Sequence, residues 1–385
     1  MEKTILLTGA TGFLGSHLIP ELTKNNFRII CLIRPQKGVA PAERIRTTLQ
    51  YVGSGIEEIL SCLDIREGDL GQKNFGLDEQ AYQQLKSDVD CILHCAAMTT
   101  FSADLAAEQW SINVEGTENL VRFALESKAI HDFHYISTAY VAGDRTDLVY
   151  EHELDKGQGF FNGYEKSKFF AEKLLQQYAR EAGLSLTVYR PSIIVGDSQS
   201  GRTVLFNGMY LFMRFFQVAK NSVQTTPEQE KVVIPVRCVG NPQVPKNFVH
   251  IDYVVNTIIA LFMLPRAHGK TYHITHDNPP PLGLMREIIE EVLGISGIEL
   301  VDASVFLTKP ANDLELFLQE QVKVYSSYLL SEPLFDRSTV KNVLPPSQLP
   351  FCPPMDRQAL HRLFTYAIES NWGRSIRGKQ NSTRQ

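Results

Sequence analysis

Near the amino terminus, a short apolar run stops at a group of glycines and then resumes with helical spacing. Residues 3–8 form the run. Apolar side chains then return three or four positions apart, at Leu14, Leu18, Ile19 and Leu22. Unbroken short runs are typical of buried strands, whereas the wider spacing is typical of a helix with one apolar face. The pattern predicts a strand, a tight turn and a helix, in that order.

The same alternation continues for more than a hundred residues. Further strands are predicted at residues 27–33, 63–66, 90–97 and 133–138, and helical patterns such as 42–49 separate them. Strands that alternate with helices form right-handed βαβ units and therefore a parallel sheet. We expect an α/β fold, a Rossmann-type doubly wound parallel sheet, whose ligands gather at the carboxyl ends of the strands.

The pattern changes after residue 195, and we expect a second domain there. A Rossmann domain should comprise residues 1–195, with 246–275 returning to it. A smaller, mostly helical substrate domain should comprise 196–245 and 276–374, and a flexible tail 375–385. Helices are expected in the ranges 254–264, 285–293, 310–330 and 355–372.

One stretch of the second domain allows two interpretations. Residues 204–216 are dense in aromatic side chains and methionine. Such a stripe suits an adaptable apolar pocket for a lipid-like chain, but it is more often part of a protein core.

Composition narrows the function classes. The 385 residues are 43% hydrophobic and 21% charged, with a net charge of −5. No basic block is long enough to follow a phosphate backbone, so nucleic acid is not expected as a partner. We expect no signal peptide and no transmembrane segment, because the first strand starts by residue 3 and the longest apolar stretch, 254–264, is short and contains Asn256.

The six cysteines are scattered and include no CxxC pair. Cys91 and Cys95 lie in an apolar strand pattern, where buried reduced thiols are expected. His94 lies between them, but too few further ligands accompany it for a metal site. We therefore predict no metal and a cytoplasmic location.

The glycine turn has the chemistry of a dinucleotide site. Gly9 permits the sharp turn, Gly12 lets backbone N–H groups approach a pyrophosphate, and Gly15 lets the helix lie close to the strand. The helix that follows presents unpaired N–H groups and a positive dipole end to the anion.

The end of the second strand indicates which dinucleotide binds. An enzyme that uses NAD usually presents an acidic residue there, but this chain presents Arg34. Arginine suits the 2′-phosphate of NADPH, and Arg44 on the next helix can join it. Asp69 and Leu70 are expected to flank the adenine, and Ala96 and Ala97 to leave space for the ribose and pyrophosphate.

A tyrosine and a lysine carry the candidate catalysis. Tyr164 and Lys168 are four residues apart in a helical pattern, so they share one face. A lysine ammonium favours the phenolate and makes the tyrosine useful in acid–base catalysis. Thr138, at the end of a strand, can supply a second hydroxyl that polarises a substrate carbonyl.

These motifs together resemble the extended short-chain dehydrogenase/reductase family. The matching segments, in order, are TGATGFLG at 8–15, HCAA at 94–97, NVEGT at 113–117, STAYVAG at 137–143, YEKSK at 164–168 and YRPSIIVG at 189–196. CLIRP at 31–35 and NFVHIDYV at 247–254 make the chain similar to the thioester reductase and fatty acyl-CoA reductase branch. The resemblance covers residues 1–275.

The resemblance implies roles for particular residues. Thr138, rather than Ser137, forms the catalytic triad with Tyr164 and Lys168. Asn113 supports the lysine through water. Further cofactor contacts are implied at Thr11, Phe13, Leu14, Pro191 and Ile194.

The resemblance also implies an activity: reduction of an acyl thioester to an aldehyde or alcohol with NADPH. The substrate is then a small molecule or a carrier-bound acyl group, with an acyl carrier protein as a partner. A nucleotide-sugar epimerase or dehydratase, or a hydroxysteroid-type dehydrogenase, remains an alternative on the same scaffold, although Arg34 argues against the sugar enzymes. A non-catalytic NADP-sensing protein is a second alternative, against which the Tyr164 and Lys168 pair argues.

Overall fold

The computed structural model describes residues 3–53, 55–223 and 231–374. The chain forms two compact units. The first comprises residues 1–192, 252–275 and 335–351, and the second comprises 193–251, 276–334 and 352–385. The tail predicted at 375–385 lies outside the described residues.

The predicted domain boundaries differ from these units in three places. The first boundary falls after Ser192, and the return segment begins at Asp252 instead of residue 246. Both shifts have one cause, because β10 (Phe248–His250) pairs with β8 (Ile193–Val195) inside the second unit. In addition, residues 335–351 belong to the first unit.

The segment 335–351 is held in the first unit by hydrogen bonds to residues far away in sequence. The backbone N–H of Asp336 donates to the carbonyl of Val149 at 2.8 Å, and that of Thr339 donates to the carboxylate of Glu151 at 2.5 Å. These hydrogen bonds join residues almost two hundred positions apart, so no local sequence pattern predicts them.

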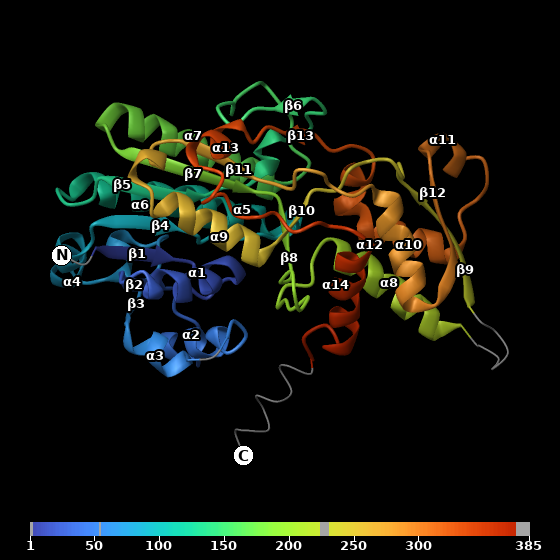
Figure 1. The fold of residues 1–385 in the computed structure, drawn as a ribbon, viewed down its shortest axis with the longest axis horizontal. Coiled ribbons are helices and arrows are strands. Elements are labelled where there is room, and N and C mark those ends of the chain that lie inside the picture. The colour runs from blue at the N-terminus through green and yellow to red at the C-terminus, as the bar shows by residue number, and fades with distance from the viewer. Residues whose placement is uncertain (1–2, 54, 224–230, 375–385) are drawn as a thin grey trace, which may run out of the picture. The chain divides into compact units, whose positions relative to one another are not determined.

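The first unit contains the predicted parallel sheet (Figure 1). Its strands, in spatial order, are β11 (Thr271–Ile274), β7 (Ser185–Pro191), β5 (Asp132–Ile136), β4 (Cys91–His94), β1 (Thr4–Thr8), β2 (Arg28–Ile33) and β3 (Leu63–Glu67). All six pairings are parallel. The Rossmann-type fold class is confirmed.

Helices cover the sheet and bury its apolar side chains. Those of the first unit are α1 (Phe13–Lys24), α2 (Pro41–Leu49), α3 (Ile56–Ser61), α4 (Glu79–Asp88), α5 (Ala106–Trp110), α6 (Gly116–Glu126), α7 (Gly163–Ala182), α9 (Ile251–Phe262) and α13 (Ser338–Val343), and β6 (Leu148–Val149) is a further short strand. Leu6 of β1, Leu120 of α6 and Leu175 of α7 belong to one buried cluster. Ile5 and Leu7 point to the opposite face, because side chains alternate along a strand. Burial on both faces explains the unbroken apolar run.

The second unit is mainly helical and has its own core. Its elements are α8 (Met209–Ser222), α10 (Leu282–Leu293), α11 (Ala303–Phe306), α12 (Asp313–Val322) and α14 (Arg357–Glu369), with the parallel strands β9 (Val232–Val239) and β12 (Ile295–Val301). The chain leaves this unit through β13 (Leu334–Phe335).

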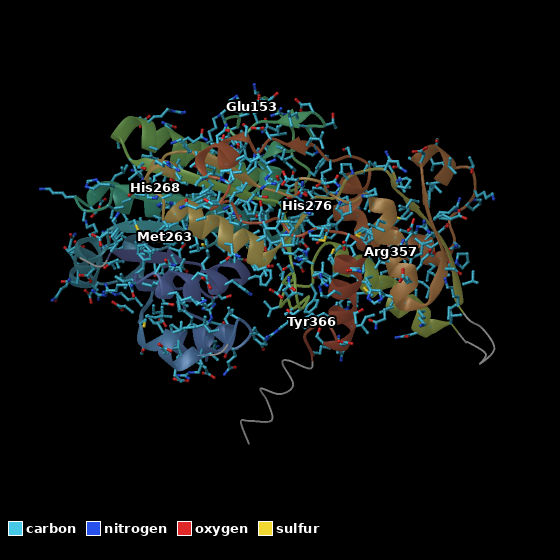
Figure 2. The ribbon with its side chains drawn as sticks, in the orientation of Figure 1. Glu153, Met263, His268, His276, Arg357 and Tyr366 are labelled. Carbon is cyan, nitrogen blue, oxygen red and sulfur yellow. The ribbon has the colours of Figure 1, made fainter. Side chains whose placement is uncertain are left out.

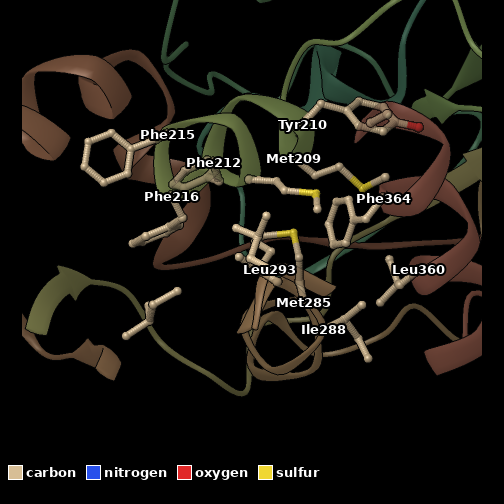
Figure 3. Packing of buried hydrophobic residues seen from close by; sticks show 14 of the residues in the cluster. Met209, Tyr210, Phe212, Phe215, Phe216, Met285, Ile288, Leu293, Leu360 and Phe364 are labelled. Atoms are coloured by element: carbon tan, nitrogen blue, oxygen red, sulfur yellow. The ribbon is translucent and has the colours of Figure 1, made fainter. Parts of the chain in front are cut away.

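The aromatic stretch 204–216 contributes mainly to this core. Met209, Phe212, Met213 and Phe216 on α8 are buried in one cluster with residues of α10 and α14, and Figure 3 shows Met285 and Phe364 packed among them. The structure therefore favours the core interpretation of this stretch over the lipid pocket.

Candidate active site

The glycine turn between β1 and α1 leaves an open cradle at one glycine. Gly9 has a φ of 72°, and a Cβ there would meet the backbone N of Ala96 at 2.6 Å. A Cβ on Gly15 would meet the carbonyl oxygen of Gly9 at 2.2 Å. At Gly12, by contrast, only the Gly9 carbonyl lies nearby, at 3.2 Å. Two glycines serve close packing, and the space beside Gly12 can take a pyrophosphate.

The start of α1 also fits an anion. Gly12 is the N-cap residue, and no side chain caps the helix. The first backbone N–H groups, at Phe13, Leu14 and Gly15, have no partner within the helix because of their position in its first turn. They can bind the phosphates of a dinucleotide.

Two arginines lie together where the sequence predicted a 2′-phosphate site. The Arg44 guanidinium donates to the backbone carbonyl of Arg34 and, at 3.4 Å, to the hydroxyl of Thr11. Burial, and then the charge of Arg34, lower the pKa of Arg44. Like charges held this close are stabilised by a bound anion, so the residues present fit NADPH.

The other predicted cofactor contacts lie just beyond two strand ends. Asp69 and Leu70 follow β3, where the Asp69 carboxylate accepts from the N–H of Gly71 at 3.0 Å and Asn119 donates to the Leu70 carbonyl at 2.7 Å. Ala96 and Ala97 follow β4, which ends three residues earlier than predicted because its partner β1 ends at Thr8. All four residues are only partly buried, so they can reach a ligand.

Thr138 and Tyr164 form a hydrogen-bonded pair. Tyr164 lies in the first turn of α7, which Asn162 caps by accepting from the N–H of Glu165 at 3.0 Å. Burial raises the pKa of Tyr164 to about 12, and the hydrogen bond with Thr138 opposes that rise. The phenol therefore keeps its proton at neutral pH and can donate it.

Lys168 lies one turn further along α7 and is buried. Its Nζ donates to the backbone carbonyl of Ile136 at 2.6 Å and lies 4.0 Å from the centroid of the Tyr135 ring. Desolvation by burial lowers the pKa of Lys168 to about 7, against an opposing effect of Glu172.

The electrostatics of this pair differ from the sequence-based expectation. We expected the ammonium to lower the tyrosine pKa, but burial dominates both groups. Removal from water disfavours the charged form of each, which raises the pKa of Tyr164 and lowers that of Lys168.

A buried acidic residue one helical turn beyond Lys168 was not predicted from the sequence. Glu172 accepts from the Ser137 hydroxyl at 2.6 Å and from Arg190 on β7 at 2.5 Å, and both charged residues are fully buried. Ser137 is thus directed toward Glu172, whereas Thr138 is directed toward Tyr164. The signal was present, since Glu172 follows Lys168 by four residues on the same helix face.

Asn113 joins two parts of the site. It lies in a π-helical turn, Ser111–Glu115, between α5 and α6. Its carbonyl oxygen accepts from the N–H of Met98 at 2.7 Å, and its amide donates to the hydroxyl of Ser167 at 2.9 Å. Asn113 therefore ties the chain after β4 to the residue that precedes Lys168.

Two of the implied cofactor contacts, Pro191 and Ile194, belong to different units. Pro191 ends β7 in the first unit, opposite Ile274 of β11. Ile194 lies on β8 in the second unit. The other predicted site residues all belong to the first unit.

Comparisons with known proteins identify the family of the chain. The model of the male sterility protein family matches residues 7–258. A non-canonical nonribosomal peptide synthetase of Aspergillus hancockii, hkm10, is 26% identical over 392 residues, which cover 96% of this chain and 37% of that protein. The aldehyde reductase lnbA of Aspergillus flavus is 28% identical over 292 residues, or 72% of this chain and 27% of that protein. The chain thus spans well under half the length of these two relatives.

One solved structure matches along nearly the whole chain. It is the terminal R domain from the myxalamid PKS-NRPS biosynthetic pathway, with a TM-score of 0.79, 25% identity, and coverage of 96% of this chain and 92% of that one. The family match spans the glycine turn, the strand ends and the Tyr164 and Lys168 pair. The chain belongs to the male sterility protein family of NAD-binding proteins, within the thioester reductase branch of the extended short-chain dehydrogenases/reductases, and is an oxidoreductase by family.

Proposed function

We propose that this protein reduces the carbonyl of an acyl thioester to an aldehyde or alcohol, with NADPH as the cofactor. The observation that carries the proposal is the hydrogen-bonded pair of Thr138 and Tyr164 one helical turn from the buried Lys168. These groups belong to the same unit as the glycine cradle and the two arginines.

The two hydroxyls act on the substrate carbonyl oxygen. Thr138 and Tyr164 hold it by hydrogen bonds that strengthen as negative charge develops. Because the pKa of Tyr164 is about 12, its hydroxyl is protonated and serves as the acid. The carbonyl carbon receives the hydride that NADPH, when bound, supplies, and the carbonyl oxygen receives the proton. The hemithioacetal so formed gives the aldehyde when its C–S bond breaks and the carrier leaves as the free thiol. An alcohol product would require a second hydride, from a second NADPH, and a second proton.

Further residues bind and position the cofactor. Lys168, whose pKa burial lowers to about 7, can donate to the ribose hydroxyls. Arg34 and Arg44 bind the 2′-phosphate, and Gly12 admits the pyrophosphate. Glu172 holds Ser137 and Arg190 in place beside this machinery.

A thioester is the substrate class that the relatives support best. The names of hkm10 and of the myxalamid R domain refer to peptide-synthetase assembly, in which acyl groups are held as thioesters on carriers. The expected substrate is therefore a small-molecule or carrier-bound acyl thioester, and the expected protein partner is an acyl carrier protein.

The test is an NADPH-oxidation assay over acyl-CoAs, carrier-bound acyl groups, aldehydes and nucleotide sugars. We expect turnover with thioesters and no reaction with nucleotide sugars. Tyr164→Phe should bind NADPH with unchanged affinity while turnover falls about 10²- to 10⁴-fold, because it loses only the acidic hydroxyl. Turnover of a nucleotide sugar alone would support the epimerase alternative. Cofactor binding without turnover of any substrate would support the non-catalytic one.

A further inference from the structure

Three potential ligands gather at the end of the sheet opposite the glycine cradle. Asp132 is the first residue of β5, and His134 follows two positions later, so both side chains point to the same face. His268 lies between α9 and β11, beyond the end of α9 (Figure 2). The proposed reaction uses none of the three, because its residues lie at the carboxyl ends of the strands.

The three side chains converge. One ligand atom of each lies within 4.8 Å of the others. The carboxylate of Asp132 and Nδ1 of His268 are 3.2 Å apart, and the rings of His134 and His268 meet edge to face at 4.7 Å between centroids. A tetrahedral zinc ion needs ligand atoms roughly 3.3–3.6 Å apart, so the widest separation would have to close by at most about 1.5 Å.

The other ring nitrogen of each histidine is already engaged. Nε2 of His268 lies 2.9 Å from the carbonyl of Phe262 and donates to it, so Nδ1, which faces Asp132, either donates to that carboxylate as part of an imidazolium or, in the neutral ring, offers its lone pair to a metal ion. Nδ1 of His134 lies 3.0 Å from the Tyr189 hydroxyl. Metal-binding histidines are oriented in this way, by a hydrogen bond from the nitrogen that does not bind the metal.

A buried nitrogen without a partner points to a missing ligand. Nε2 of His134 has no hydrogen-bond partner among the residues that the structure describes, although His134 is fully buried. His94, on the neighbouring strand β4, offers a contrast. Its two ring nitrogens bind the hydroxyls of Thr8 and Thr117, at 2.7 and 2.9 Å. A buried polar atom ordinarily finds such a partner. Among the described residues, Nε2 of His134 is one of eight buried side-chain atoms that do not, and it belongs to the convergent cluster of Asp132 and His268.

We propose that Asp132, His134 and His268 bind a divalent transition-metal ion of the zinc class. Two imidazoles and one carboxylate are donors that zinc(II) accepts, and a water molecule can complete the coordination. The ion would tie β5 to the segment between α9 and β11. The sequence-based prediction of no metal considered only the region of Cys91, His94 and Cys95, and this site would overturn it.

The competing arrangement is an ion pair between a protonated His268 and Asp132. It accounts for those two residues, but it leaves Nε2 of His134 without a partner. The two arrangements differ in an observable way. Only the metal site requires His134 for binding of an added metal ion.

The experiment uses the full chain without a polyhistidine tag, after treatment with a chelator. Titration with zinc chloride followed by calorimetry should show one ion per chain. Asp132→Asn, His134→Gln and His268→Gln should each weaken binding by at least about 100-fold, because each removes a ligand. His131→Gln is the matched control, since His131 is exposed and directly precedes Asp132. It should bind zinc like the unmodified protein.

Two outcomes would overturn the site: no stoichiometric binding to the unmodified protein, or binding that survives His134→Gln unchanged. Should a ligand variant fail to fold, as judged by circular dichroism, Tyr189→Phe provides the second test. It removes only the hydroxyl beside His134 and should weaken zinc binding about 10- to 100-fold. Unchanged affinity in that variant would count against the proposed orientation of His134.

Discussion

Lys168 is a buried cation whose surroundings oppose its charge. Its folded-state pKa is about 7, below the ordinary value of 10.5, because it is desolvated. Between these two values the unfolded chain binds a proton that the folded chain releases. The contribution of Lys168 to the free energy of unfolding therefore rises with pH across this window and is least favourable at pH 7 and below.

Replacing this lysine should stabilise the protein in the absence of cofactor. We expect Lys168→Met to raise the free energy of unfolding at pH 7, with a gain that shrinks as the pH approaches 10.5. Urea unfolding at several pH values measures this. Lys166→Met, at an exposed position on the same helix, is the control and should show no such pH-dependent gain. A gain that is independent of pH would contradict the low pKa.

Arg34 and Arg44 determine the predicted cofactor preference. A charge-assisted hydrogen bond to a phosphate contributes about 1.5–3 kcal/mol, or roughly ten- to a hundredfold in affinity. Arg44→Gln should weaken NADPH binding by that factor and leave NADH binding unchanged, and Arg34→Asp should reverse the preference. Fluorescence titration with both cofactors provides the measurement. Equal affinity of the unmodified protein for the two would refute the assignment.

At the scale of residues, the sequence predicts pairs of side chains that are close along the chain, but it does not predict partners that are far apart in sequence. Tyr164 and Lys168 were found because helical spacing places them on one face. The partners of Glu172 come from the residue that follows β5 and from β7, and the third member of the candidate metal cluster, His268, is 136 positions from Asp132. Burial, which determines the pKa values of the catalytic pair, is a property of the folded unit and not of spacing.

The turn between β1 and α1 allows a matched test at the scale of an element. Gly12→Ala places a methyl group beside the predicted pyrophosphate position, 3.2 Å from the Gly9 carbonyl oxygen. A shift of a few tenths of an ångström relieves that contact, so the protein should fold while cofactor affinity falls about tenfold or more. Gly15→Ala places the methyl group 2.2 Å from the Gly9 carbonyl and should instead separate α1 from β1. We expect that second variant to lose roughly 1–3 kcal/mol of stability.

Thermal unfolding and cofactor titration of both glycine variants separate the two roles. Gly12→Ala should keep the melting temperature within a few degrees of the parent, whereas Gly15→Ala should lower it clearly. Normal cofactor affinity in Gly12→Ala would show that the pyrophosphate does not approach this glycine.

The central strands of the sheet could be predicted because they are buried on both faces, whereas the edge strand β3 is only partly buried. Runs such as 27–33 and 63–66 correspond to β2 and β3 within a residue or two. The π-helical turn at Asn113 could not be predicted, since it depends on the contacts of that side chain with Met98 and Ser167.

At the scale of the whole molecule, sequence-distant pairings decide which unit each segment joins. The segment 335–351 joins the Rossmann unit through Val149 and Glu151, and 246–251 joins the second unit through β8. Among the described residues, no helix has the length and apolar character needed to cross a membrane.

The buried core of the second unit can be tested by a single substitution on α8. Met213 is fully buried in a cluster that contains Met285 of α10 and Phe364 of α14 (Figure 3). Met213→Ala should therefore cost about 2–5 kcal/mol of stability, because it leaves a cavity. If instead α8 lines a pocket for an acyl chain, the same change would enlarge that pocket. Each additional buried methylene contributes about 0.8 kcal/mol, so the preferred chain would lengthen.

Denaturant unfolding and specificity constants across an acyl-thioester series distinguish the two roles of α8. We expect lower stability with an unchanged order of preference among chain lengths. Arg214→Ala, at the next and exposed position, is the control and should change neither quantity. A preference for longer acyl chains with unchanged stability would instead indicate that α8 lines the substrate pocket. Met213 packs within the second unit, so this result tests only the contribution of that unit. The roles of Thr138, Tyr164 and Lys168 in the first unit are tested separately, by variants of those residues.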